Sequence, residues 1–141
     1  MEENIRNYNI GQSDYSKHNI QPWDIWISWK LNPFDADLLK RLLRHKSSDP
    51  REMDYNKMVH ICKERIRQLS VNKIDPFDEL YKASGSLTDK ITTHQISIEY
   101  NLGKALLDYK LLDIIKSLSD NNEKDNRLSL YKRFVELIEN R

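Results

Sequence analysis

The residues best suited to chemistry in this sequence are basic side chains spaced along one predicted helix. Asp37, Lys40, Arg41 and Arg44 stand at positions i, i+3, i+4 and i+7, so they share one side of that helix. Guanidinium and ammonium groups on a common face can bind the oxygens of a phosphate. The alternative, which the spacing alone favours, is a solvated face on which Asp37 pairs with Arg41.

Aromatic and charged side chains flank this helix on both sides. Trp23, Trp26 and Trp29 recur at i, i+3 and i+6, a spacing that could stack a nucleobase but is more typical of a buried face or an oligomer contact. Asp54 and Lys57, near the start of the next predicted helix, allow the same two interpretations as the basic face. These residues leave phosphate binding and simple packing both open.

Several common catalytic sites are excluded or disfavoured. No G-x-x-x-x-G-K-[ST] motif occurs, which excludes a Walker-type phosphate loop. His45, His60 and His94 lack the spacing of metal ligands, which argues against a zinc site. Helical nucleotide pyrophosphohydrolases pair an E-x-x-E with an E-x-x-D motif, whereas Glu136 and Glu139 form a lone E-x-x-E at the end of the chain.

The elements that must position these side chains are helices. A capping residue directly before a proline marks a helix start, and the pattern occurs at Asn32-Pro33, Asp49-Pro50 and Asp75-Pro76. We expect another helix from Gln21-Pro22, and the helix that follows Asp75 should stop at Gly85. Apolar residues recurring at helical spacing support each of these assignments.

The second half of the chain predicts three more segments. The stretch after Gly85 fits a helix capped at Thr88 or a short extended segment, and we favour the helix. Residues 101–118 are apolar around most of the helix circumference, which predicts the central buried helix. After a polar turn, an amphipathic helix with Leu130, Phe134, Leu137 and Ile138 closes the chain.

Composition and length limit the partners and the fold that the chain can have. The 141 residues carry 23 basic and 22 acidic side chains, so the total charge implies neither sequence-specific DNA binding nor an anionic membrane partner. No stretch approaches the roughly 18 apolar residues of a membrane span, and Cys62, the only cysteine, fits a buried structural thiol in a reducing, cytoplasmic compartment. We expect an all-α compact bundle of about six helices, with a flexible segment 1–14 and one domain 15–141 made of parts 15–70 and 75–141.

A set of spaced residues in the first half of the chain follows a family pattern. The pattern reads YSKHNIQPWD, LLKRLLRHK and DYNK in this sequence, and its members are Tyr15, Lys17, His18, Ile20, Pro22, Asp24, Phe34, Lys40, Arg44, Lys46, Asp54 and Lys57. Over about residues 15 to 69 the chain thereby resembles the small P-loop-free nucleotide kinase family of tailed phages.

The resemblance implies a helical homo-oligomer that binds nucleotides in the cytoplasm of an infected bacterial host. Together with the basic face, it gives a candidate phosphate-binding set of Tyr15, Lys17, His18, Lys40, Arg41, Arg44, Lys46 and Lys57. Asp24 and Asp54 are the matched carboxylates that could orient a ligand or hold Mg²⁺, the one cofactor implied if the protein is a nucleoside or deoxynucleoside monophosphate kinase.

Some residues depart from the family pattern, and these departures affect the expectation of catalytic turnover more than that of nucleotide binding. Ala36 and Asp37 stand where the family tends to have Gly-Asn, and Arg41 and Ile61 stand where it tends to have tyrosines. Losing a positioning residue can remove phosphoryl transfer while leaving binding. We therefore weigh three hypotheses: a nucleotide-binding protein with or without kinase turnover, a sponge that sequesters cyclic or other nucleotide signals of antiviral defence, and a helical protein-interaction module.

Overall fold

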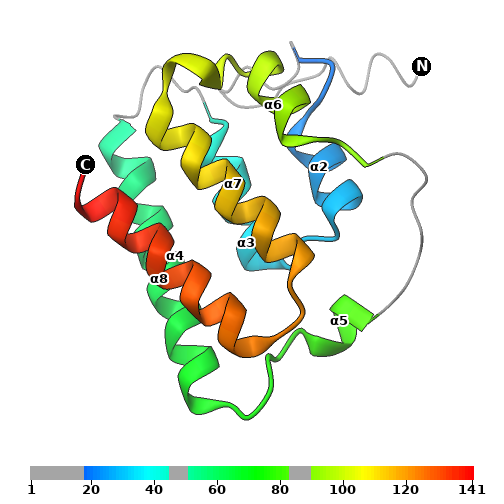
Figure 1. Cartoon of the computed structure of the whole chain (residues 1–141), viewed down its shortest axis with the longest axis vertical. Helices are drawn as coiled ribbons and strands as arrows, with labels where there is room; N and C mark the ends of the chain where they lie inside the picture. The colour runs from blue at the N-terminus through cyan, green and yellow to red at the C-terminus, as the bar shows by residue number, and fades with distance from the viewer. Residues whose placement is uncertain (1–17, 45–50, 83–89) are drawn as a thin grey trace.

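The chain folds as an all-α bundle (Figure 1), as its sequence predicts. The computed structural model describes residues 18–44, 51–82 and 90–141. In these ranges the helices are α2 (Pro22–Trp29), α3 (Pro33–Leu42), α4 (Arg51–Val71), α5 (Asp78–Lys82), α6 (Thr93–Glu99), the 3₁₀ helix η2 (Leu102–Lys104), α7 (Leu106–Asp120) and α8 (Lys124–Glu139). Oligomerisation stays a prediction.

Two of the predicted helix starts are found in the structure, and the one at Asn32 carries its expected cap. The side-chain oxygen of Asn32 accepts a hydrogen bond from the backbone N–H of Asp35 at 2.8 Å, and Pro33 occupies the first turn of α3. At the start of α2, the backbone N–H of Gln21 donates to the carboxylate of Asp24 at 2.9 Å. The predicted start at Asp49-Pro50 lies outside the described residues.

Other predicted boundaries need correction. Helix α5 begins at Asp78 rather than at Pro76, because the Asp75 carboxylate is drawn into the core and caps only the backbone N–H of Phe77, at 2.9 Å. Helix α6 is capped by Thr92, whose hydroxyl accepts from the backbone N–H of Gln95 at 3.1 Å. The predicted cap Thr88 and the predicted stop Gly85 both lie outside the described residues.

The predicted helix over 101–118 divides into η2 and α7. Asn101 adopts a left-handed conformation with φ 56°, and Ala105, with φ −120° and ψ 82°, separates the two helices. The α7 helix nonetheless has the central position that its apolar pattern predicts, since it packs against α3, α6, η2 and α8.

The core lies between α3, α4, α7 and α8. Figure 1 shows α4 and α8 side by side and antiparallel, with α7 against α8. Cys62 is fully buried among these helices, as predicted, and burial raises the pKa of its thiol far above the ordinary range. Within the described ranges, no helix combines the length and apolar character needed to cross a bilayer.

Candidate functional site

A buried ion cluster joins four helices and the segment after α4. Its members are Asn32, Asp35, Arg65, Asp75, Tyr81, Arg127 and Tyr131. Both arginines and both aspartates are at most 2% exposed. Arg65 pairs with Asp75 at 2.6 Å, and Arg127 pairs with Asp35. The cluster thus brings two cations and two anions into the core as mutual partners.

Two tyrosine hydroxyls connect the ion pairs of this cluster. The Tyr131 hydroxyl donates to Asp35 and accepts from Arg65 at 3.1 Å. The Tyr81 hydroxyl donates to Asp75 at 3.0 Å and accepts from the Asn32 amide at 2.8 Å. Because the charges are enclosed and hydrogen-bonded to each other, the cluster is suited to holding α3, α4, α5 and α8 together rather than to binding a ligand.

The predicted basic face does not act as one patch. Arg41 pairs with Asp37, with Nε to Oδ1 at 3.3 Å, which confirms the pairing expected for a solvated face. The prediction that Arg44 continues this helix face is wrong, because α3 ends at Leu42 with Leu43 as its C-cap. Arg44 instead faces α4, where its Nη1 lies 3.9 Å from an oxygen of the buried Asp54. Lys40 is exposed on the other flank of α3. We call Asp37, Lys40 and Arg41 the α3 ridge.

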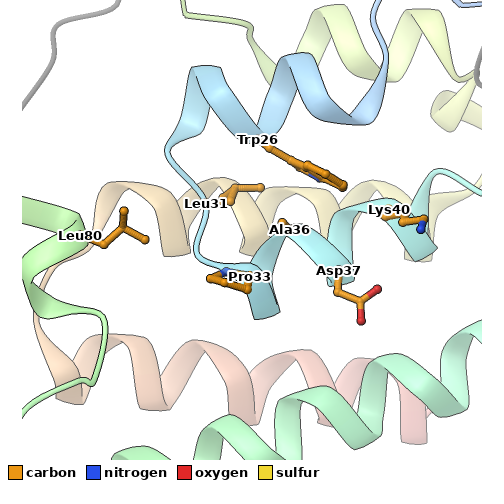
Figure 2. A pocket seen from close by; sticks show the side chains of 7 residues that line it. All are labelled: Trp26, Leu31, Pro33, Ala36, Asp37, Lys40 and Leu80. Atoms are coloured by element: carbon orange, nitrogen blue, oxygen red, sulfur yellow. The ribbon is translucent and has the colours of Figure 1, made fainter. Parts of the chain in front are cut away.

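On one side of the ridge lies a groove of about 620 Å³ between α2 and α3, which we call the α2/α3 groove (Figure 2). Its walls are Trp26, Leu31, Pro33, Ala36, Asp37, Lys40 and Leu80. Figure 2 shows the Trp26 indole projecting from α2 toward α3, with Lys40 farther along α3. An aromatic face and an ammonium group therefore line the same apolar groove.

On the other side of the ridge lies the α3/α4 groove, of about 390 Å³. It is lined by Asp37, Arg41, Asn56, Lys57, His60 and Ile61. The Nε and Nη1 atoms of Arg41 are buried and make no hydrogen bond within the described residues. Buried donors of this kind are costly unless an acceptor satisfies them. The groove thus joins Arg41 and Lys57, two residues that the sequence places in the candidate set.

The two grooves meet at Asp37, which lines both. Around this carboxylate stand three cationic side chains, namely Lys40 on one flank and Arg41 and Lys57 on the other. Groove volumes of this size fall in the range of small-molecule sites. Within the described residues, the α3 ridge and its two grooves can together receive a ligand with a flat apolar part and an anionic part.

The two candidate carboxylates each have partners within the fold. Asp24 caps the first turn of its own helix, α2, through the backbone N–H of Gln21. Asp54 lies in α4 with the guanidinium groups of Arg51 and Arg44 at 3.6 and 3.9 Å. In the ranges that the structure describes, no group of three or more His, Cys, Asp or Glu side chains is arranged to hold a metal ion. Both aspartates serve the fold.

The amino-terminal candidates lie apart from the ridge or outside the described residues. His18 stacks on Tyr100, with ring centroids 4.1 Å apart, and its Nδ1 lies 3.3 Å from Glu99. It lines neither groove. Tyr15, Lys17 and Lys46 lie outside the described residues.

The tryptophan stripe divides among three environments. Trp29 is a core residue, 3% exposed, and its indole N–H donates to the carbonyl of Ile91 at 2.7 Å. Trp26 is half-buried in the groove wall, and its indole N–H has no acceptor within the described residues. Trp23 is 44% exposed. Core packing is confirmed for Trp29, whereas Trp23 lies outside the core, and the oligomer contact that the same spacing allows stays a prediction.

The sequence analysis did not identify the buried arginines. Arg65 occupies the same helix face as Met58, Cys62 and Leu69, which are fully buried. Arg127 likewise shares one face of α8 with the buried Tyr131, Phe134 and Ile138. A charged residue inside an apolar helical stripe was the available signal.

Comparison of the chain with protein-family models, with curated proteins and with solved structures finds no match. The resemblance to the phage nucleotide kinase family therefore stays a prediction based on spaced residues.

Proposed function

We propose that this protein binds a nucleotide at the α3 ridge and does not turn it over. The observation that carries the proposal is the meeting of the two grooves at Asp37, with the Trp26 indole on one side and Arg41 and Lys57 on the other. A nucleotide has the matching division into a flat base and a charged phosphate.

The base would lie against the Trp26 indole. Stacking of a nucleobase on an aromatic side chain contributes about 1–3 kcal/mol and tolerates any base. Leu31 and Pro33 supply apolar surface on the same groove wall. This arrangement favours nucleotides as a class over one particular base.

The phosphate would lie across the ridge. Lys40 supplies a point charge, and Arg41 supplies a buried Nη1 that makes no hydrogen bond within the described residues. Lys57 and the His60 ring, one turn apart on α4, complete the opposite wall. Asp37 opposes an anion at this point, so it limits affinity.

Binding without turnover follows from the roles of the carboxylates. Phosphoryl transfer needs positioned groups and, in most enzymes, Mg²⁺ held by carboxylates. Asp24 and Asp54 are already engaged as a helix cap and as a partner of two arginines. A non-catalytic binder also suits the sponge hypothesis, which differs only in the nucleotide that is held.

Calorimetric titration with a panel of nucleoside mono- and triphosphates and cyclic nucleotides tests this proposal. We expect saturable binding that weakens about tenfold in Arg41→Gln. Lys110→Ala is the matched control because Lys110 is exposed on α7, away from both grooves. Absence of binding by every nucleotide would overturn the proposal.

Turnover is tested by recovery of the ligand. Nucleotide incubated with the protein, ATP and Mg²⁺ should be recovered unchanged after heat denaturation of the complex, as shown by mass analysis. Appearance of a phosphorylated product would restore the kinase hypothesis.

A second candidate function is a protein-interaction module. Trp23 and Ile27 lie one turn apart on α2 and are 44% and 65% exposed. Large apolar side chains exposed together can mark a contact surface. This function is favoured if nucleotides do not bind and a pull-down partner is lost in the double variant Trp23→Ser with Ile27→Ser.

A further inference from the structure

A third pocket, of about 260 Å³, is lined mainly by polar side chains and lies apart from the α3 ridge. The end of α2 and the second half of α7 form most of this pocket. Lys90, which lies before the α6 cap Thr92, and Tyr81 of α5 also contribute. Three lysines line it, namely Lys30, Lys90 and Lys116. We call it the lysine pocket.

The lysine pocket has more positive than negative charge. Lys116 is placed by two contacts, an ion pair with Asp120 at 2.7 Å and a position 5.6 Å from the centroid of the Trp29 ring. Among the described residues, Asp120 is the one acidic side chain in the pocket lining. Lys30 and Lys90 have no carboxylate within ion-pair distance in the described ranges. Two of the three ammonium charges are thus left without a neutralising partner there.

The backbone at Lys30 gives an independent indication. Lys30 ends α2 in the left-handed region, with φ 53° and ψ 50°. Glycine is the residue that usually adopts this conformation at a helix end, because a Cβ atom is strained there. A strained residue kept in a pocket wall is a reason to look for function. Here the strain places a long cationic side chain where glycine would place none.

We propose that Lys30, Lys90 and Lys116 bind a phosphate group, carried by inorganic phosphate or by a small phosphomonoester. Three ammonium groups suit a compact dianion, because each contributes charge and hydrogen-bond donors without a fixed planar geometry. The Asn122 side chain in the same wall adds an amide donor. This site shares no lining residue with either groove of the α3 ridge, so each proposal can fail without the other.

The competing explanation is that these lysines only stabilise helix ends. Lys30 follows the last turn of α2 and Lys116 lies in the second half of α7, where the helix dipole favours cations. That explanation does not account for Lys90, which lies before α6 and outside any helix. It also predicts no response to phosphate beyond that of ionic strength.

Thermal unfolding and calorimetric titration of the full chain distinguish the two explanations. Inorganic phosphate and glycerol phosphate are each compared with sodium chloride at matched ionic strength. We expect phosphate to raise the melting temperature above the chloride control and to saturate. Saturation by glycerol phosphate alone identifies a phosphomonoester as the source. Absence of saturation by both overturns the proposal.

Lys30→Gly separates binding from stability. Because glycine relieves the left-handed strain, we expect the variant without phosphate to melt about 2–4 °C higher than the wild type. The same variant should bind phosphate at least about fivefold more weakly, since one of three ammonium groups is lost. Lys116→Gln should weaken phosphate binding similarly, whereas Lys110→Gln should not. A Lys30→Gly protein that retains its phosphate affinity would contradict the assignment.

Discussion

The buried ion cluster and the α3 ridge use the same side-chain types in opposite ways. In the cluster, Arg65 and Arg127 are enclosed and pair with Asp75 and Asp35. On the ridge, Arg41 pairs through Nε with a single half-exposed carboxylate, and its buried Nη1 makes no hydrogen bond in the described residues. Charge that is satisfied within the protein supports the fold, and charge that is incompletely satisfied beside a groove is available to a ligand.

The difference also separates effects on stability from effects on binding. Removing one partner of a buried pair leaves an uncompensated charge in the core, which is strongly destabilising. An exposed pair contributes little to folding because water screens it. Variants in the cluster should therefore change the free energy of unfolding, and variants on the ridge should change ligand affinity.

The largest expected effect is that of Arg127→Met. This change leaves the Asp35 carboxylate buried without its cation, so we expect the free energy of unfolding to fall by about 3–5 kcal/mol. Urea unfolding monitored by circular dichroism measures it. The matched ridge variant Arg41→Met should lose less than about 1 kcal/mol. Equal losses in the two variants would remove the distinction between the regions.

The next effect is the pH dependence contributed by Asp75. Burial opposes ionisation of this carboxyl, but hydrogen bonds from Arg65 and from the backbone N–H of Phe77 outweigh it and lower its pKa below the ordinary 3.8. A depressed pKa gives stability that is present above the unfolded-state value and is lost as the pH falls through the folded-state value.

Asp75→Asn should therefore cost about 3 kcal/mol at pH 7. The cost should shrink below about pH 4, where the carboxyl of the unfolded wild-type chain takes up a proton while the folded one is still ionised. Urea unfolding of both proteins between pH 3 and pH 7 gives the difference directly. A difference that stays constant over this range would mean that Asp75 is not held ionised by Arg65.

A smaller effect should distinguish Trp29 from Trp26. Trp29→Phe loses the hydrogen bond to the Ile91 carbonyl and leaves a small cavity, so we expect a loss of about 1–2 kcal/mol. Trp26→Phe removes an indole N–H that has no acceptor among the described residues, so stability should change by less than about 0.5 kcal/mol. Thermal unfolding of both variants tests the contrast, which a larger loss in Trp26→Phe would reverse.

The smallest expected effect is a gain in nucleotide affinity. Asp37→Asn removes the negative charge that lies between the two grooves, so a nucleotide should bind about two- to threefold more tightly at low salt. The gain should disappear at high salt because exposed charges are screened. Asp125→Asn, on the exposed face of α8, is the matched control. Weaker binding by Asp37→Asn would show that this carboxylate contacts the ligand favourably.

The sequence predicted more of the fold than of the site. Capping at Asn32-Pro33 and the apolar pattern of α8 are local properties, and both were confirmed. The spacing of Lys40, Arg41 and Arg44 predicted one shared helix face, but α3 ends at Leu42, before Arg44. The spacing also could not show that α2 and α4 lie on opposite flanks of α3. The burial of Arg65 depends on Asp75 and Tyr131, which come from distant parts of the chain. Tertiary contacts of this kind leave only a weak trace in sequence periodicity.

The most direct test of the central claim, that two grooves form one nucleotide site, is calorimetric titration of Trp26→Leu and Lys57→Gln with a nucleoside and with its monophosphate. We predict that the nucleoside loses affinity only in Trp26→Leu, and that the monophosphate loses about tenfold in Trp26→Leu and about fivefold in Lys57→Gln. Monophosphate binding that is unchanged in both variants would contradict a site at the α3 ridge.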